Sequence, residues 1–316
     1  MIESVGTPLM WSVFAVIVVT ALALDLFVFH RRAHAVTFRE SAIWVVVWVS
    51  LALLFDLWIW LQLGSKPALE FLAGYLVEEA LSVDNIFVFI VVFRYFGTPS
   101  EYRHRVLFWG ILGAVLMRGL FVLLGVALIA RFHWVIYIFG VFLVYTGVKL
   151  LTHSEVQIDP EKNPAIGFLR RHLRIVPRHE GQKFLVREPD GKLWATPLLV
   201  VLLVIEATDV VFAVDSIPAI FGITKDPFII FTSNIFAVLG LRAMYFVLHG
   251  LMDRFEYLHY GLGLVLAFVG LKMLLEHWVH VPIQVSLGVI VVLLGGAVLI
   301  SWISEKRRGP RDPQGP

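Results

Sequence analysis

Long apolar runs separated by short polar stretches dominate the pattern of this chain. A run of about 20 apolar residues lets a helix cross the roughly 30 Å of hydrocarbon in a bilayer. Runs of this kind predict helices at 9–29, 41–62, 67–93, 106–130, 134–152, 196–221, 228–250, 256–275 and 283–303. The pattern therefore predicts an all-α, polytopic membrane protein of about nine transmembrane helices, folded as one domain over 1–316.

Polar segments divide this domain. Residues 1–66 hold two N-terminal helices, 153–195 form a long polar linker containing several prolines, and 276–308 hold the last helix. The Pro- and Gly-rich tail 309–316 is predicted to be disordered. No Lys or Arg precedes the first apolar run, which favours a retained helix over a cleaved signal peptide.

Two three-helix segments, 67–152 and 196–275, resemble one another. Matching positions are Glu78 with Asp209, Val83-Asp84-Asn85-Ile86 with Val214-Asp215-Ser216-Ile217, Arg118 with Arg242, Gly140 with Gly263 and Gly147 with Gly270. Because each unit has an odd number of helices, the two units enter the bilayer from opposite sides. An inverted repeat of this kind is typical of secondary transporters, whose substrate site lies near the midplane.

Lysine and arginine counts predict the orientation. With the N-terminus outside, 19 Lys and Arg residues fall on the cytoplasmic side and three fall outside, namely Lys66, Arg131 and Lys225. The positive-inside rule then gives N-out and C-in, most simply in a bacterial inner (plasma) membrane. No basic stripe with interleaved aromatics suggests a nucleic-acid partner. The sequence has no cysteine, which excludes disulfides and thiolate metal sites within it.

Carboxylates inside the predicted membrane helices require a functional explanation. Each costs roughly 2.5 to 3.5 kcal/mol at the bilayer centre, so such groups face one another, water or an ion. The set comprises Glu78, Asp84, Glu206, Asp209 and Asp215. Arg118 and Arg242 are the cations expected near them, since Lys149 and Lys272 lie near helix ends and can extend to the interface. The remaining deficit of three charges would be cancelled by a divalent cation and a proton. Structural ion pairing alone is the alternative.

Helix geometry limits how these acids can meet. Positions six apart, such as Asp209 and Asp215, lie on different faces of an unbroken helix, so one ion reaches both only if the helix loosens. Pro218 would free the carbonyl of Val214 for this purpose. In the first unit, which lacks such a proline, Ser82 and Asn85 would have to act instead. Glu79, Asp25 and Asp56 are open between a functional role and an ordinary helix surface or helix end.

Several segments closely resemble the TerC family of membrane proteins, first named for tellurium resistance. They include Glu78-Glu79-Ala80-Leu81-Ser82-Val83-Asp84-Asn85, Glu206-Ala207-Thr208-Asp209-Val210-Val211-Phe212-Ala213-Val214-Asp215-Ser216-Ile217-Pro218 and Thr232-Ser233-Asn234-Ile235-Phe236-Ala237-Val238-Leu239-Gly240-Leu241-Arg242. Family members of this kind are associated with manganese export. The resemblance implies that Glu78, Asp84, Glu206, Asp209 and Asp215 bind the ion. Candidates for completing the site are Glu79, Asn85, Ser216, Asn234 and Asp25.

The ligand chemistry agrees with this implication. Carboxylate, carbonyl and water oxygens suit Mn²⁺, whereas Zn²⁺ and Cu⁺ favour His and Cys. Oxygen ligands alone do not separate Mn²⁺ from Mg²⁺ or Ca²⁺. We therefore expect a secondary exporter, not an enzyme, that carries cytosolic Mn²⁺ across the lipid bilayer and releases it as the acids are protonated. A non-transporting membrane component or metal sensor of a tellurite or envelope stress response is the alternative. The oligomeric state is not predicted.

Overall fold

The computed structural model describes residues 4–29, 37–132, 134–152, 174–176, 178, 180–188, 191–249 and 257–308. The predicted tail 309–316 and most of the predicted linker lie outside these residues. The same holds for the side chain of Asp25.

The described part of the chain is helical apart from one small hairpin. Its helices are α1 Pro8–Phe29, α2 Phe38–Leu63, α3 Ser65–Tyr95, α4 Ser100–Arg131, α5 Val135–Thr152, α7 Pro197–Phe221, α8 Pro227–His249, α9 Leu258–Leu275 and α10 Ile283–Arg308. Each lies where an apolar run predicted a helix, and the largest boundary difference is six residues, at the start of α4.

Seven of the described helices are long and apolar enough to cross a membrane, namely α2, α4, α5, α7, α8, α9 and α10. Helix α3 is as long, but its middle carries Glu78, Glu79 and Asp84. These acids lower the apolar character of α3 without changing its length. The chain is therefore a polytopic membrane protein, while the full count of nine spans and the inverted repeat stay predictions.

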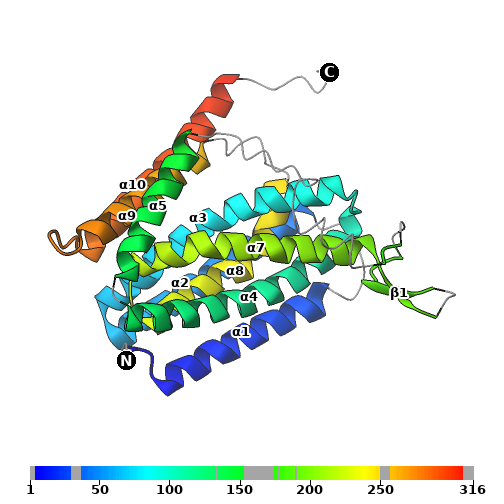
Figure 1. The fold of residues 1–316 in the computed structure, drawn as a ribbon, viewed down its shortest axis with the longest axis horizontal. Coiled ribbons are helices and arrows are strands. Elements are labelled where there is room, and N and C mark those ends of the chain that lie inside the picture. Colours follow the sequence, from blue (N-terminus) through cyan, green and yellow to red (C-terminus); the bar gives the residue numbers. More distant parts are fainter. Residues whose placement is uncertain are drawn as a thin grey trace.

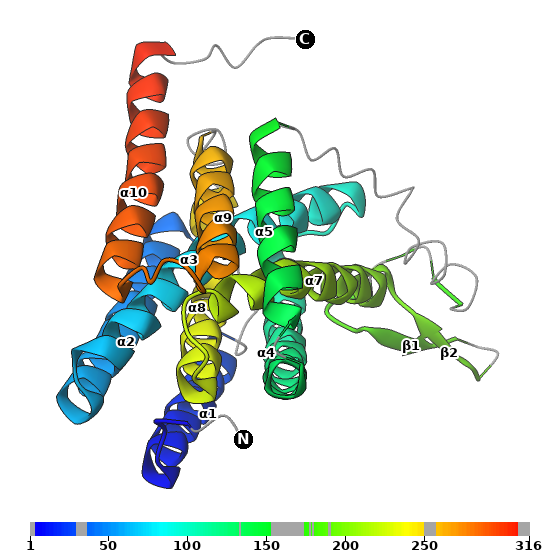
Figure 2. The ribbon, with the colours of Figure 1, turned by 60° about the vertical axis from the view of Figure 1, so that its left-hand side comes forward.

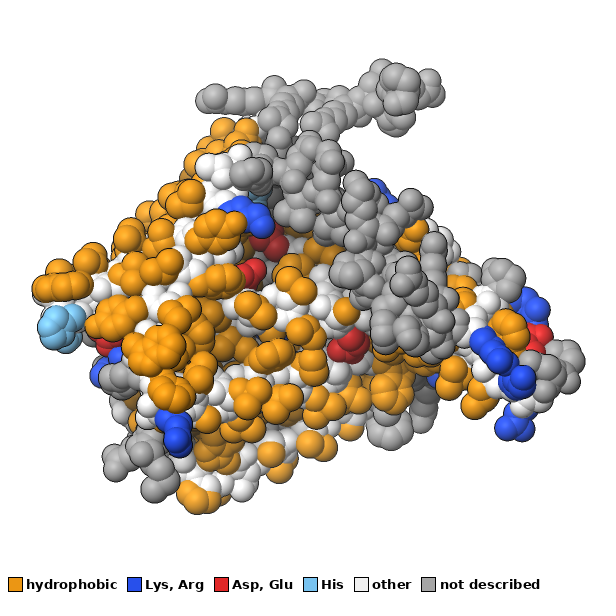
Figure 3. Space-filling view, viewed as in Figure 1, with side chains coloured by type: hydrophobic (Ala, Val, Ile, Leu, Met, Phe, Trp, Pro, Cys, Tyr) orange, Lys and Arg blue, Asp and Glu red, His pale blue; other side chains and the backbone are white. Residues whose placement is uncertain are grey.

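Two groups of helices are visible in the ribbon views. Helices α1, α2, α3, α4, α7 and α8 form a core bundle, and α5, α9 and α10 form an arm that runs across it (Figures 1 and 2). Within the core bundle α8 packs against α2, α3 and α4, and α4 packs against α7. Helix α8 is buried along nearly its whole length, whereas α2 and α10 present many apolar side chains outward. The visible face in Figure 3 is largely hydrophobic, as expected of a surface in contact with lipid.

Glycines bring α5 and α9 into close contact. A Cβ atom at Gly147 would lie 2.6 Å from the carbonyl oxygen of Gly263, and one at Gly140 would lie 3.1 Å from that of Gly270. The reverse contacts are equally short, at 2.9 Å for Gly263 and 2.7 Å for Gly270. Without side chains at these positions the two backbones approach directly, as small residues allow in membrane helices.

Polar residues and prolines fix where the inner helices begin. Asp226 Oδ1 accepts hydrogen bonds from the backbone N–H groups of Phe228 and Ile229, at 2.9 and 3.1 Å, and so caps the start of α8. Helices α7 and α8 begin at Pro197 and Pro227, where a missing N–H costs nothing. These signals set the register of the two helices that carry Asp209 and Asn234.

A short antiparallel hairpin precedes α7, although the sequence predicted only a polar linker there. Its strands are β1 Leu185–Arg187 and β2 Leu193–Ala195. Arg105 of α4 holds the hairpin, because its guanidinium lies 5.2 Å from the ring of Phe184 and donates to Gln182 Oε1 at 3.5 Å. Nearby, a hydrogen bond from Arg178 lowers the pKa of the exposed Glu180 carboxyl.

Candidate cation site

Arg118 of α4 stands at the centre of the candidate site. It is fully buried and forms ion pairs with Glu78 of α3 and Asp209 of α7, the latter at 3.4 Å. Asn234 of α8 accepts a hydrogen bond from Arg118 Nη1 at 3.2 Å and donates one to Glu78 Oε2 at 3.1 Å. Four side chains from four helices thus form one buried polar cluster, which we call the Arg118 cluster.

Ion pairing explains why these charges are tolerated at this depth. A buried charge without a partner is costly, so the guanidinium and the two carboxylates stabilise one another. Arg118 balances the charge of these two acids because α4 brings it directly to both of them. That the acids bind an ion, and do not serve in ion pairing alone, stays a prediction. With two carboxylates and one guanidinium, the Arg118 cluster keeps one negative charge.

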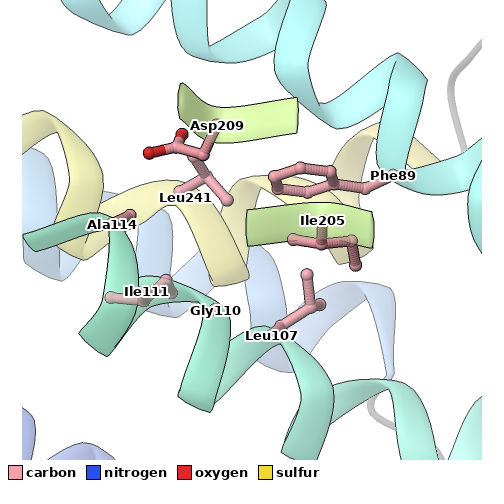
Figure 4. Close-up of a pocket in the computed structure, with 8 residues that line it drawn as sticks. All are labelled: Phe89, Leu107, Gly110, Ile111, Ala114, Ile205, Asp209 and Leu241. Carbon is pink, nitrogen blue, oxygen red and sulfur yellow. The ribbon is translucent and has the colours of Figure 1, made fainter. Parts of the chain in front are cut away.

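Asp209 also has capacity to bind a further cation. Its Oδ1 accepts from Arg118, whereas its Oδ2 is buried and has no hydrogen-bond partner among the described residues. The residue lines a small apolar pocket between α3, α4, α7 and α8, and it is the charged member of that lining (Figure 4). The lining comprises Phe89, Leu107, Gly110, Ile111, Ala114, Ile205, Asp209 and Leu241.

Glu206 lies one turn before Asp209 on α7 and is half-buried. Its carboxylate rests on Gly113 of α4, so that a Cβ atom at Gly113 would overlap both of its oxygens. In the part of the chain that the structure describes, Glu206 forms no ion pair or hydrogen bond. The absence of a side chain at position 113 is thus what admits this carboxylate to the interface between α4 and α7.

Asp84 and Asp215 do not join the Arg118 cluster. Both are half-buried, and each follows a member of the cluster by six positions on a helix that remains continuous. Helix α7 runs through Pro218 and α3 runs through Asn85, so neither helix is broken between its two acids in this structure, and the condition under which one ion reaches both acids of a helix is not met. The exposed Lys149 of α5 acts electrostatically on Asp215.

The remaining candidates occupy separate places. Glu79 lies against α8, where a Cβ atom at Gly240 would be 3.6 Å from its Oε1. Asn85 and Ser216 are buried, and Asn85 Nδ2 and Ser216 Oγ have no hydrogen-bond partner among the described residues. Arg242 is buried on α8. Whether these side chains take part in ion binding stays a prediction.

The five acids do not converge on one point. Within the described ranges, no three His, Asp or Glu side chains lie close enough together to hold a metal ion. The acids instead occupy the Arg118 cluster, the Gly113 contact of Glu206, and the separate positions of Asp84 and Asp215. Sequence reasoning missed the role of Gly113, although a glycine in the middle of a membrane helix is a signal of close approach.

Comparison with known proteins identifies the family. The profile of the integral membrane protein TerC family matches residues 63–309. The chain is 50% identical over 313 residues to an uncharacterized membrane protein of Myxococcus xanthus, STKORF319, covering 99% of this chain and 98% of that protein. It is 46% identical over 320 residues to a proposed membrane-bound redox modulator of Escherichia coli K12, Alx, covering 97% of this chain and 99% of that protein. A membrane protein of Rickettsia bellii is 41% identical over 295 residues, covering 93% of this chain and 97% of that protein. No solved structure matches the chain. The chain belongs to the TerC family of integral membrane proteins.

Proposed function

We propose that this protein is a secondary transporter that exports Mn²⁺ from the cytoplasm. The observation that carries the proposal is the Arg118 cluster together with Glu206 beside it, which has no ion-pair partner among the described residues. Acidic groups inside membrane helices mark ion pathways when their charge is not fully neutralised within the protein. Here the cluster keeps one negative charge and Glu206 adds another, which a divalent cation would balance.

The donor set favours a hard cation. Glu78 and Asp209 offer carboxylate oxygens and Asn234 offers an amide oxygen. Among the described residues the Glu206 carboxylate stands apart, at Gly113, and would have to move to join them. Such ligands suit Mn²⁺, Mg²⁺ and Ca²⁺ better than Zn²⁺ or Cu⁺. Manganese is the ion that the resemblance to the TerC family implies. Asp84 and Asp215 would bind the ion on its way into or out of the Arg118 cluster, and protons would be carried in the opposite direction.

The inverted repeat is part of the proposal, and the packing supports it. Gly147 matches Gly270 and Gly140 matches Gly263, so exchanging the two units converts the Gly147–Gly263 contact into the Gly270–Gly140 contact. Both contacts are present. The same exchange relates Glu78 to Asp209, the two acids that share Arg118. This pseudo-symmetry is the arrangement in which a site at the unit boundary can be exposed to either side.

The position of the pocket beside Asp209 is compatible with entry of the ion from the cytosol. It is lined by Leu107 and Ala114 from the first half of α4 and by Ile205 from the first half of α7. With the N-terminus outside, both helices begin on the cytoplasmic side. The pocket then lies between the cytosol and Asp209, where an exported ion would enter.

A redox role is the second candidate, because the Escherichia coli relative carries that name. The present sequence has no cysteine, so it has no thiol of its own to exchange. A redox effect would then have to arise from a bound or transported ion. A non-transporting metal sensor in a stress-response complex is the further alternative, and a flux assay separates it from an exporter.

The test is uptake of ⁵⁴Mn²⁺ by liposomes that contain the purified protein. Wild type should move the ion, and Asp209→Asn should slow it by more than the roughly tenfold that loss of an outer partner costs a metal site. Glu180→Gln, which removes an exposed acid of the hairpin region, should leave the flux unchanged. Absence of wild-type flux would contradict the exporter and favour the sensor.

A further inference from the structure

Arg118 occupies the place where a bridging ion would sit. Its guanidinium lies between Glu78 and Asp209 and is paired with both. These acids come from α3 and α7, at matching positions of the two repeat units. A cation that engaged both units at once would therefore take the position that the guanidinium now holds.

Charge decides whether the guanidinium and a divalent ion can be present together. The Arg118 cluster carries two carboxylates and one guanidinium, so replacing the guanidinium by a divalent cation brings the charge of the two carboxylates to zero. Keeping the guanidinium as well would place two cationic groups side by side in a site from which water is excluded, where their repulsion is strong. Binding of the ion between Glu78 and Asp209 thus requires Arg118 to withdraw.

The surroundings permit such a withdrawal. Arg118 Nε has no hydrogen-bond partner among the described residues, so the side chain is held mainly by the groups that an ion would also engage. Asn234 is bonded to both Arg118 and Glu78, and it remains as a neutral donor to Glu78 when the guanidinium leaves. Asp209 lines the pocket, and its buried Oδ2 has no hydrogen-bond partner in the described part of the chain, so it can meet the incoming ion first.

We propose that Arg118 is a tethered cation that substitutes for the transported ion in the empty carrier and selects divalent over monovalent ions. This inference rests on the proposed function. Exchange of the guanidinium for Na⁺ or K⁺ leaves the charge of the cluster unchanged and offers no electrostatic gain. Exchange for a divalent ion removes the remaining negative charge. The empty carrier meanwhile keeps its buried carboxylates paired.

The test uses Arg118→Ala, purified with millimolar methylguanidinium to fill the space left by the side chain. After removal of methylguanidinium, Mn²⁺ measured by electron paramagnetic resonance should bind at least about tenfold more tightly than to wild type, because its competitor is gone. Added methylguanidinium should weaken Mn²⁺ binding competitively in this variant. It should have no effect on wild type or on Arg118→Lys, which retains a tethered charge.

The outcomes separate this inference from the proposed function. If wild type neither binds nor moves Mn²⁺, the exporter proposal fails. The tethered cation is refuted if wild type moves Mn²⁺ but Arg118→Ala binds Mn²⁺ no more tightly than wild type does. It is also refuted if methylguanidinium does not compete with Mn²⁺ in Arg118→Ala. Should Arg118→Ala not fold, the double variant Arg118→Gln/Asp209→Asn keeps the charge of the cluster. Its Mn²⁺ binding should be inhibited by Na⁺, unlike that of wild type, and insensitivity to Na⁺ would overturn the inference.

Discussion

Replacement of Gly113 by alanine should displace the Glu206 carboxylate from its position against α4 without changing any charge. An ideal Cβ atom at this position overlaps both oxygens and the carboxyl carbon of Glu206, so the carboxylate has to turn away from α4. The neighbour that must move is the end of a flexible side chain and not backbone. The helices themselves therefore keep their positions, and the change falls on the placement of the carboxylate.

The effect on stability should be small. Alanine is about 1 kcal/mol more favourable than glycine in a helix interior. Overpacking costs about 1–3 kcal/mol, and the lower end applies because the Glu206 side chain can swing. The two terms nearly cancel, so the amount of protein in the membrane should remain within about twofold of wild type. Manganese flux, in contrast, should fall if the carboxylate belongs to the ion path.

The assay is ⁵⁴Mn²⁺ flux in liposomes, measured beside the amount of folded protein. Gly295→Ala on α10 is the control, because nothing lies within 4 Å of its Cβ atom and the residue is remote from the pocket beside Asp209. Adding Glu206→Asp to Gly113→Ala shortens the acid by one methylene group and should restore part of the flux. Equal flux in Gly113→Ala and wild type, at equal protein levels, would refute the role assigned to Glu206.

Three further predictions concern packing, orientation and ion preference. Gly147→Ala should lower the melting temperature by several degrees, since its Cβ atom would lie 2.6 Å from the Gly263 carbonyl oxygen and overpacking costs about 1–3 kcal/mol. Gly288→Ala should leave the melting temperature unchanged, because nothing lies within 4 Å of its Cβ atom. Equal melting temperatures of the two variants would contradict the close contact of α5 with α9. A cysteine at Lys66 should react with an impermeant thiol reagent in intact cells and one at Lys192 should not, as the sequence has no other thiol; the reverse pattern would overturn the N-out orientation. Mn²⁺ should raise the melting temperature at lower concentration than Mg²⁺ or Ca²⁺; equal shifts would indicate a generic acidic site.

The helices could be predicted from the sequence because their signal is local. A membrane helix needs only length and apolar character, and both are read within one window of the chain. Helix α3 was predicted despite its acids, since long apolar stretches flank them on both sides. The hairpin Leu185–Ala195 was not predicted, because its short strands lie in a polar segment and are held by Arg105, which is far away in sequence.

The candidate site was only partly predictable. The acids were identifiable from their cost in a membrane, but which of them carry a partner depends on how α4 packs against α3 and α7. Arg118 was expected to balance charge, yet nothing in the sequence assigns it to Glu78 and Asp209 instead of Asp84 and Asp215. Helix continuity decides this, because positions six apart on an unbroken helix face different neighbours.

The two matching lysines of the proposed repeat have different partners in this structure. Lys149 and Lys272 occupy matching positions, as do Asp215 and Asp84. Among the described residues, Lys149 acts electrostatically on Asp215, whereas Lys272 interacts electrostatically with Glu276 and Glu70 and not with Asp84. Related residues with unequal partners mean that the two units have different surroundings in this conformation. For a transporter built from inverted units, such inequality distinguishes the two sides of the membrane, and its reversal would expose the Arg118 cluster to the opposite side.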